Sequence, residues 1–193
     1  MSPEGGAEQK IKPPTARVFF ALWPSPVLAS ALADVAIAAA QRYGGRSSRA
    51  DTMHLTLAFL GEVPEAALPT LCALAAEIKA PPFELVIDRL GFWSHNHLLW
   101  AGCSTTPAPL QDMALALQNS LIAAGFTPDR ADRRFTPHLT LLRKVPFISQ
   151  PGRDDPLPNI SPLPWPCSRW VLVRSRSNAQ GPSYQVIGGF LLA

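Results

Sequence analysis

The side chains best suited to chemistry in this chain belong to a four-residue string that occurs twice. His-Leu-Thr-Leu begins at His54 and again at His138. Side chains alternate between the two faces of a β-strand, so each histidine shares a face with the threonine two positions later, Thr56 or Thr140, while the leucines anchor the other face. Two such strands facing each other would enclose a cleft with two imidazoles and two hydroxyls. This set of groups suits a phosphate ligand.

Paired histidines are suited to proton transfer at neutral pH. An unperturbed imidazole has a pKa near 6.5, so one ring can give a proton while the other takes one. The threonine hydroxyls could bind phosphate oxygens as negative charge builds up on them. A single histidine in a strand is more often a structural residue, but two identical motifs favour one composite site. The sequence has no obvious carboxylate cluster, and we expect neither a metal ion nor a cofactor.

The elements that must position these motifs alternate along the chain. Apolar runs, prolines and glycines predict a mixed α+β fold with similar halves. We expect helices over 25–43, 64–80 and 107–125, and strands over 17–23, 53–60, 83–92, 97–103, 137–143, 169–175 and 184–192. Turns are expected at Gly61 and at Gly181-Pro182, and the proline-rich segment 150–166 is expected to be an irregular surface loop.

Composition predicts a compact protein without a membrane anchor. The chain has 193 residues, of which 47% are hydrophobic and 16% charged. We expect a flexible tail over 1–15, one bilobal domain over 16–193, a cytoplasmic location and a monomer. Three cysteines at wide spacings indicate reduced thiols. Residues 1–129 carry 8 basic and 11 acidic side chains, and residues 130–193 carry 9 basic and 3 acidic. A basic end of this size suits a small or terminal phosphate.

The sequence resembles the two-histidine phosphoesterase superfamily, and within it the RNA 2′,3′-cyclic phosphodiesterase family, also called 2′-5′ RNA ligase. The resemblance lies in the strand Arg17-Val-Phe-Phe-Ala-Leu, in the segment from His54 to Gly61, in Phe135-Thr-Pro-His-Leu-Thr-Leu-Leu-Arg143, and in the strand near Tyr184. It implies a bilobal α+β fold in which two pseudo-symmetric antiparallel sheets, flanked by helices, surround a central cleft.

The resemblance also implies a role for each motif residue. His54 would be the proton donor to the leaving 3′ oxygen, and His138 the proton acceptor that activates water. Thr56 and Thr140 would bind the phosphate of an RNA 2′,3′-cyclic end. The product would be a 2′-phosphate, and the reverse reaction would join RNA ends through a 2′-5′ linkage. The residues alone do not rank the two histidines as acid and base.

Arg143 and Phe59 each lie three residues after a motif threonine. The family usually has an arginine near the phosphate at the position of Arg143. An odd spacing puts a strand residue on the opposite face, so Arg143 reaches the cleft only if the strand ends or bulges there. A solvated charge at the strand end is the other interpretation. Phe59 could stack a nucleobase, but core packing is favoured.

Other residues have a functional and a structural interpretation. His95 and His97 could belong to a metal site, but a turn between strands is favoured. Two arginine groups could contact RNA backbone or be solvated: Arg130, Arg133 and Arg134, and Arg174 with Arg176. Four tryptophans are expected to pack rather than stack on bases: Trp93, Trp100, Trp165 and Trp170.

Two further functions remain open. A sister activity would hydrolyse a small cyclic phosphate, such as a cyclic nucleotide or ADP-ribose cyclic phosphate, with the same cleft chemistry. A protein of another class, an RNA-end binding module without catalysis, is disfavoured because both histidines and both threonines are present. A preference for an oligonucleotide over a mononucleotide substrate would distinguish hydrolysis of RNA ends from the first alternative, hydrolysis of small cyclic phosphates.

Overall fold

The computed structural model describes residues 13–129, 135–146, 151, 156–178 and 181–193. Most of the tail predicted for residues 1–15 lies outside them. The strands are β1 (Thr15–Leu22), β2 (Arg46–Ser47), β3 (Leu55–Pro64), β4 (Phe83–Ile87), β5 (Arg89–Trp93), β6 (Leu98–Gly102), β7 (His138–Arg143), β8 (Leu163–Cys167), β9 (Arg169–Asn178) and β10 (Gly181–Leu191). The helices are α1 (Pro26–Tyr43), α2 (Leu68–Ala76) and α3 (Ala108–Ala123), with short 3-10 turns η1 (Ala50–Thr52), η2 (Glu65–Ala67) and η3 (Ser94–Asn96).

The main sheet consists of two antiparallel halves that meet at one residue pair. Its order is β10-β9-β1-β3-β7-β6-β5, with β2 added beside β7. β1 and β3 pair over their whole length, but β3 and β7 pair only through Leu55 and Leu139. β4 and β8 form a separate two-stranded sheet. The mixed fold with antiparallel sheets confirms the predicted α+β class, and the single contact between β3 and β7 marks the boundary of the two halves.

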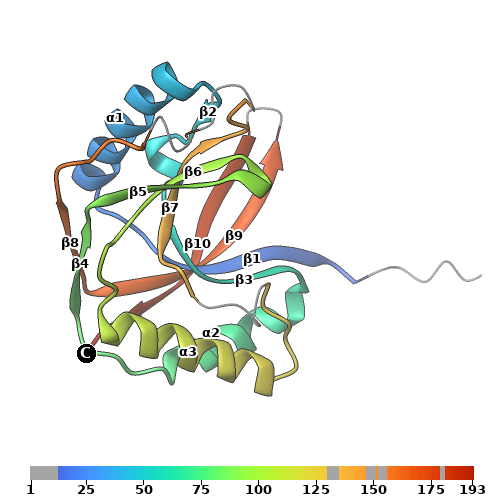
Figure 1. Ribbon diagram of the computed structural model, residues 1–193. Coiled ribbons are helices and arrows are strands. Elements are labelled where there is room, and N and C mark those ends of the chain that lie inside the picture. The colour runs from blue at the N-terminus through green and yellow to red at the C-terminus, as the bar shows by residue number, and fades with distance from the viewer. Residues whose placement is uncertain (1–12, 130–134, 147–150, 152–155, 179–180) are drawn as a thin grey trace, which may run out of the picture.

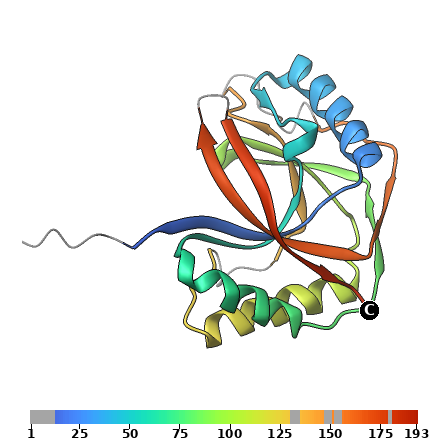
Figure 2. The ribbon, with the colours of Figure 1, turned by 180° about the vertical axis from the view of Figure 1, so that it is seen from behind.

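The helices cover opposite sides of the main sheet. Figures 1 and 2 show α2 and α3 side by side on one side, with α1 on the other. α1 begins as predicted, because Ser25 Oγ accepts a hydrogen bond from Leu28 N (3.3 Å), and it ends at Gly44 with a φ of 67°. A positive φ disfavours any residue with a Cβ, so glycine ends a helix readily there. α3 matches its prediction within two residues.

β1 is buried on both faces, which explains its unbroken apolar run. Phe20 and Leu22 pack into the main core with Trp170, and all three are fully buried. Phe19 and Ala21 point to the other face, where a second cluster includes half-buried aromatic side chains. Full burial of one large apolar side chain contributes roughly 1.5–3 kcal/mol. β1 therefore holds the core together and also supports the face of the sheet on which the candidate site lies.

The second helix is shorter than the prediction of 64–80. The turn η2 precedes it, and α2 begins only at Leu68, with a proline in its first turn. Its end is tightened, because Ile78 N donates to Ala75 O (3.2 Å) and Lys79 Nζ donates to Ala76 O (3.0 Å). These two bonds satisfy carbonyls that a further helical turn would otherwise use, so the helix stops before Pro81.

The strand predicted over 83–92 is two strands that belong to different sheets. The chain is interrupted at Asp88, whose carboxylate accepts hydrogen bonds from the backbone N and the hydroxyl of Ser104. β5 then pairs with β6 as predicted, while β4 turns away to pair with β8. These bonds tie Asp88 to the residues just after β6, and at this point the chain passes from one sheet to the other.

The prediction of an irregular loop over 150–166 is wrong at its end. Strand β8 includes Pro164 and Pro166, which are exposed, while Trp165 and Cys167 between and after them are buried. Proline has no N–H group and is tolerated in edge strands, where that group would face solvent. β8 pairs only with β4, so alternating prolines cost no sheet hydrogen bonds within the protein.

Two predicted turns are in fact within strands. Gly61 lies inside β3 with a φ of 66°, and it pairs with Val18 next to a register shift in the β1–β3 ladder. A glycine that takes a positive φ at a bulge lets the strand continue instead of ending it. Gly181 and Pro182 pair with Asn178 and Ser177, so they open β10 rather than form the turn.

Among the described residues, none of the helices is both long and apolar enough to span a membrane.

Candidate active site

The two motif histidines lie beside the single contact that joins the halves of the sheet. His138 is the first residue of β7, and His54 immediately precedes β3. The residues after them, Leu55 and Leu139, form the β3–β7 pair and are fully buried. The leucines thus anchor the motifs in the core, as expected, and bring the two imidazoles close together on the opposite face.

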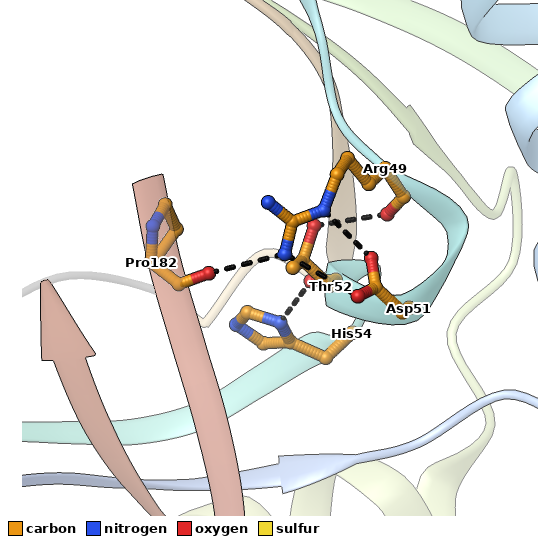
Figure 3. A network of polar contacts seen from close by, with 5 residues as sticks. All are labelled: Arg49, Asp51, Thr52, His54 and Pro182. Carbon is orange, nitrogen blue, oxygen red and sulfur yellow. Dashed lines mark hydrogen bonds and ion pairs between the residues drawn. The ribbon is translucent and has the colours of Figure 1, made fainter. Parts of the chain in front are cut away.

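Both imidazole rings are oriented by the same backbone contact. His54 Nδ1 donates to Thr52 O and His138 Nδ1 donates to Thr136 O, each over 2.8 Å. A carbonyl oxygen can only accept, so Nδ1 carries the hydrogen in both neutral rings. Nε2 is therefore the atom at which each ring gains or loses a proton. Figure 3 shows the contact between His54 and Thr52.

A bulge in each motif strand brings one further side chain to the face that carries the histidine and the threonine. In the β1–β3 ladder Phe20 pairs with Ala58 and Ala21 pairs with Thr56, which leaves Leu57 as an extra residue. In the β6–β7 ladder Leu141 is the extra residue, because Leu99 pairs with Leu142 and Trp100 pairs with Thr140. One extra residue reverses the side-chain alternation beyond it.

The bulges decide the interpretation of the residues three positions after each threonine. Arg143 shares the cavity face with Thr140, which is the outcome expected if the strand bulged or ended there. Phe59 likewise shares the cavity face with Thr56, and it also packs on the small apolar cluster around Phe19, as the preference for core packing expected. Phe59 is half-buried, and the guanidinium carbon of Arg17 lies 4.8 Å from its ring centre.

The motif residues converge on a cavity of about 730 Å³. All five predicted site residues line it: His54, Thr56, His138, Thr140 and Arg143. The wall also includes aromatic and basic side chains that sequence reasoning did not assign to the site: Trp93, Tyr184, Arg46 and Arg49. A volume of this size fits a ligand larger than inorganic phosphate, such as a nucleotide.

Aromatic rings enclose His54 on several sides. Its ring stacks on Phe19 (centroids 4.6 Å apart) and Trp23 (5.4 Å), and Tyr184 approaches it edge-on at 5.2 Å. Burial lowers the pKa of His54 to about 4, with smaller lowering effects from the charges of Arg143 and His138, while the bond to Thr52 O opposes the shift. In the absence of a ligand His54 is therefore neutral at pH 7.

The fold and the motifs match known proteins. Residues 22–100 match the family model "LigT like Phosphoesterase". A structure of Escherichia coli LigT in complex with 3′-AMP is 27% identical and superposes with a TM-score of 0.83, over 93% of this chain and 99% of that chain. Over residues 22–100, and in its fold, the chain is similar to the LigT-like phosphoesterases. Two curated proteins to which the chain is similar are both named RNA 2′,3′-cyclic phosphodiesterase.

The alignments with these two relatives differ in extent. The Escherichia coli relative is 39% identical over 51% of this chain and 55% of its own length. The Thermus thermophilus relative is 28% identical over 91% of this chain and 90% of its own length. In the first alignment the chain therefore spans about half the length of the curated relative that it matches.

His138 has an aromatic neighbour that was predicted only to pack. The Trp93 ring lies edge-on to the His138 ring, with centroids 4.5 Å apart, and it lines the cavity. Trp100, Trp165 and Trp170 are buried, in agreement with the prediction. Trp93 differs because it is the last residue of β5, where that strand reaches the cavity.

Of the remaining residues that the sequence suggested for the site, some line the cavity and others lie elsewhere. His95 lies in η3, the turn expected between two strands, and lines the cavity. Arg174 forms an ion pair with Glu65 (3.0 Å), and neither Arg174 nor Arg176 is part of the cavity wall. Arg130, Arg133 and Arg134 are outside the described residues.

Proposed function

We propose that this protein hydrolyses the 2′,3′-cyclic phosphate ends of RNA to 2′-phosphomonoesters by general acid/base catalysis without a metal ion. The proposal rests on one observation above all. Two imidazoles with the same backbone contact line one cavity together with two threonine hydroxyls and an arginine. The names of the curated relatives support the substrate, and the 3′-AMP in the Escherichia coli LigT structure supports a nucleotide ligand.

The proposed reaction is an in-line displacement at phosphorus. His138 Nε2 takes a proton from a water molecule, whose oxygen attacks the phosphorus. The bond from phosphorus to the ribose 3′ oxygen breaks, and His54 Nε2 gives its proton to that oxygen. Thr56, Thr140 and Arg143 bind the non-bridging oxygens while charge builds up on them. Each proton transfer contributes roughly 10²–10⁴-fold to the rate.

The direction of proton flow comes from the family resemblance. It requires His54 to be protonated before it can act as the proton donor. Because burial keeps this ring neutral at pH 7 in the ligand-free protein, it must gain a proton when the anionic cyclic phosphate enters. A phosphate beside the ring favours the charged imidazolium, so the bound substrate raises the pKa that burial lowers. With a 5′-hydroxyl in place of water, the same groups would join a 2′,3′-cyclic end to a 5′-hydroxyl end through a 2′-5′ bond: His138 takes the proton of the hydroxyl, and His54 gives its proton to the leaving 3′ oxygen.

We further propose that residues 16–193 act as one bilobal unit, as a monomer in the cytoplasm, with no cofactor. The nearest alternative is hydrolysis of small cyclic phosphates. The cavity is compatible with this alternative because its volume would also hold a mononucleotide. The comparison of oligonucleotide and mononucleotide substrates separates the two.

The test is incubation of the protein with an oligonucleotide that ends in a 2′,3′-cyclic phosphate, followed by identification of the product. We expect a 2′-phosphate in the presence of a metal chelator. A 3′-phosphate would reverse the roles of His54 and His138, and loss of turnover with the chelator would contradict the metal-free mechanism.

His54→Ala and His138→Ala should each reduce turnover by at least about 10²-fold, because each removes one proton transfer. Circular dichroism serves as the control that both variants are folded. Turnover close to that of the unmodified protein in either folded variant would exclude the two-histidine mechanism.

A further inference from the structure

Three arginines line the cavity on the side formed by β2 and the end of β7. Arg46 comes from β2, Arg49 from the segment before η1, and Arg143 ends β7. We call these three residues the arginine rim. Of the rim, only Arg143 was assigned to the phosphate by sequence, and the proposed reaction uses neither Arg46 nor Arg49.

Arg46 and Arg143 lie directly opposite each other in the β2–β7 ladder. Like charges in directly opposed positions destabilise a strand pair. Among the described residues, no carboxylate forms an ion pair with either guanidinium to offset this repulsion. The backbone holds the pair together nevertheless, because Ser48 N donates to Leu141 O (2.8 Å) at the bulge of β7. An anion bound near both side chains would relieve the repulsion.

Arg49 is held so that it extends the rim towards β10 (Figure 3). Its guanidinium donates to the carboxylate of Asp51 (Nε to Oδ1, 3.0 Å) and to Pro182 O (3.3 Å). A Cβ placed on Gly181 would lie 3.9 Å from Arg49 Nη1 and 4.0 Å from Arg46 Nη2. The two guanidinium groups thus converge over Gly181. Asp51 offsets the charge of Arg49, so the excess positive charge of the rim comes from Arg46 and Arg143.

The arginine rim lies on the same cavity wall as the histidines, and its charge acts on groups at that site. Burial is the main cause that lowers the pKa of His54, and the charge of Arg143 lowers it further. Partial burial raises the pKa of Tyr184, while the charges of Arg143, Arg17 and Arg49 oppose this rise. Arg143 shares the cavity wall with the histidines and pairs with Arg46 in the β2–β7 ladder. An arginine at the reacting phosphate, with two more guanidinium groups on the same cavity wall, fits a ligand with a second phosphate.

We propose that Arg46, with Arg49 beside it, forms a second anion subsite for the phosphate on the 5′ oxygen of the nucleotide whose cyclic phosphate reacts. In an RNA strand this phosphate is the first internal phosphodiester. The inference rests on the proposed function and adds a reason for specificity: the subsite selects RNA ends over nucleosides that carry only the cyclic phosphate. Guanidinium groups suit this role because they bind phosphate oxygens in pairs.

The experiment compares three substrates: a nucleoside 2′,3′-cyclic phosphate, the same compound with a 5′-phosphate, and a dinucleotide that ends in the cyclic phosphate. Each is measured as kcat/KM with the unmodified protein, Arg46→Gln and the matched control Arg169→Gln. Arg169 is exposed on β9 and does not line the cavity. Binding of the dinucleotide 2′-phosphate product is measured in parallel, so that the subsite is tested even without turnover.

We expect the dinucleotide and the 5′-phosphorylated compound to exceed the bare nucleoside by about tenfold or more, the effect of one charge-assisted hydrogen bond. Arg46→Gln should abolish this advantage and weaken product binding to a similar degree. The salt dependence of kcat/KM for the dinucleotide should become shallower by about 0.7 in log–log slope. Arg169→Gln should change none of these values.

An advantage that persists in Arg46→Gln, or an equal loss on all three substrates, overturns the subsite. If no substrate is hydrolysed but the product binds in an Arg46-dependent way, the subsite stands and the proposed reaction fails. If the bare nucleoside is hydrolysed and Arg46→Gln has no selective effect on turnover or binding, the reaction stands and the subsite fails.

Discussion

At the scale of single residues, the environment of His54 determines what its imidazole can do. Three aromatic rings surround it, while its Nδ1 hydrogen is held by a backbone carbonyl. The first feature disfavours the charged ring and the second favours it, and burial prevails, because the pKa falls to about 4. A histidine built in this way is neutral until an anion arrives, which is useful for a residue that must receive its proton together with the substrate.

The lowered pKa predicts a particular dependence of stability on pH. The unfolded chain binds a proton at His54 below about pH 6.5, whereas the folded protein does so only near pH 4, so stability rises with pH between these values. The stabilisation from the neutral ring is complete above pH 6.5 and is lost as pH falls towards 4, by at most about 3 kcal/mol. Urea unfolding of His54→Gln should show a flatter acid slope, and parallel curves for the two proteins would contradict this.

Ligand binding should reverse the shift. We expect the His54 pKa, measured from its ring signals by NMR, to rise by at least about one unit when a nucleoside 2′-phosphate occupies the cavity, because a nearby anion favours the imidazolium. The Thr56→Val variant, which lacks a hydroxyl for the phosphate, should show a smaller rise at equal ligand concentration. An unchanged pKa in the saturated protein would argue against His54 as the proton donor.

At the scale of elements, the bulges in β3 and β7 determine which residues face the cavity. Both follow the motif threonine, and both turn the residue three positions later towards the ligand, as Phe59 in one half and Arg143 in the other. The two halves thus use the same backbone device and differ in the side chain that it presents. The arginine adds charge beside the phosphate, while the phenylalanine adds an aromatic ring.

The β5–β6 pair predicts a sharp difference between two glycines. A Cβ on Gly91 would lie 2.0 Å from the Trp100 indole, which packs near His138, whereas a Cβ on Gly189 would have no heavy atom within 4 Å. Gly91→Ala must displace the indole, and we expect a loss of about 1–3 kcal/mol in the free energy of unfolding. Gly189→Ala is the matched control and should stay within about 0.5 kcal/mol. Similar values for both variants would contradict this packing.

At the scale of the whole molecule, the site depends on the narrow junction between the halves of the sheet. β3 and β7 pair at Leu55 and Leu139 alone, and each histidine is the residue before this pair. The separation of the two imidazoles is therefore set where the sheet has least pairing. α1 packs on β7 and β2, and α3 packs on β3, so each half also carries its own helix.

Shortening a side chain of the β3–β7 pair should reduce activity by more than its loss of folding stability alone would cause. Leu55→Ala should lower the free energy of unfolding by about 2–5 kcal/mol, and Leu117→Ala in α3, also fully buried, should do the same. Only Leu55→Ala is expected to reduce kcat by about tenfold or more under conditions where both variants are folded, because a displacement near 1 Å can cost roughly 10²-fold. Equal activity in the two folded variants would show that the junction does not set the geometry.

Much of this protein could be predicted from local patterns in the sequence. Alternation in His-Leu-Thr-Leu was enough to place Leu55 and Leu139 in the core and the histidines and threonines together on one cavity, because strand periodicity depends only on neighbouring residues. Capping residues likewise predicted α1 and α3 closely. Prediction failed where distant partners decide: β4 leaves β5 to pair with β8, which lies far away in the chain.

The tertiary structure alone decided which further side chains join the site. Trp93, Tyr184 and Arg46 come from three different strands, and no spacing in the sequence relates them to a motif. The bulges at Leu57 and Leu141 appear only in the pairing with β1 and β6, since an extra residue is defined by the strand opposite it. The sequence by itself therefore determined the reacting groups and their faces, and long-range pairing determined the cavity around them.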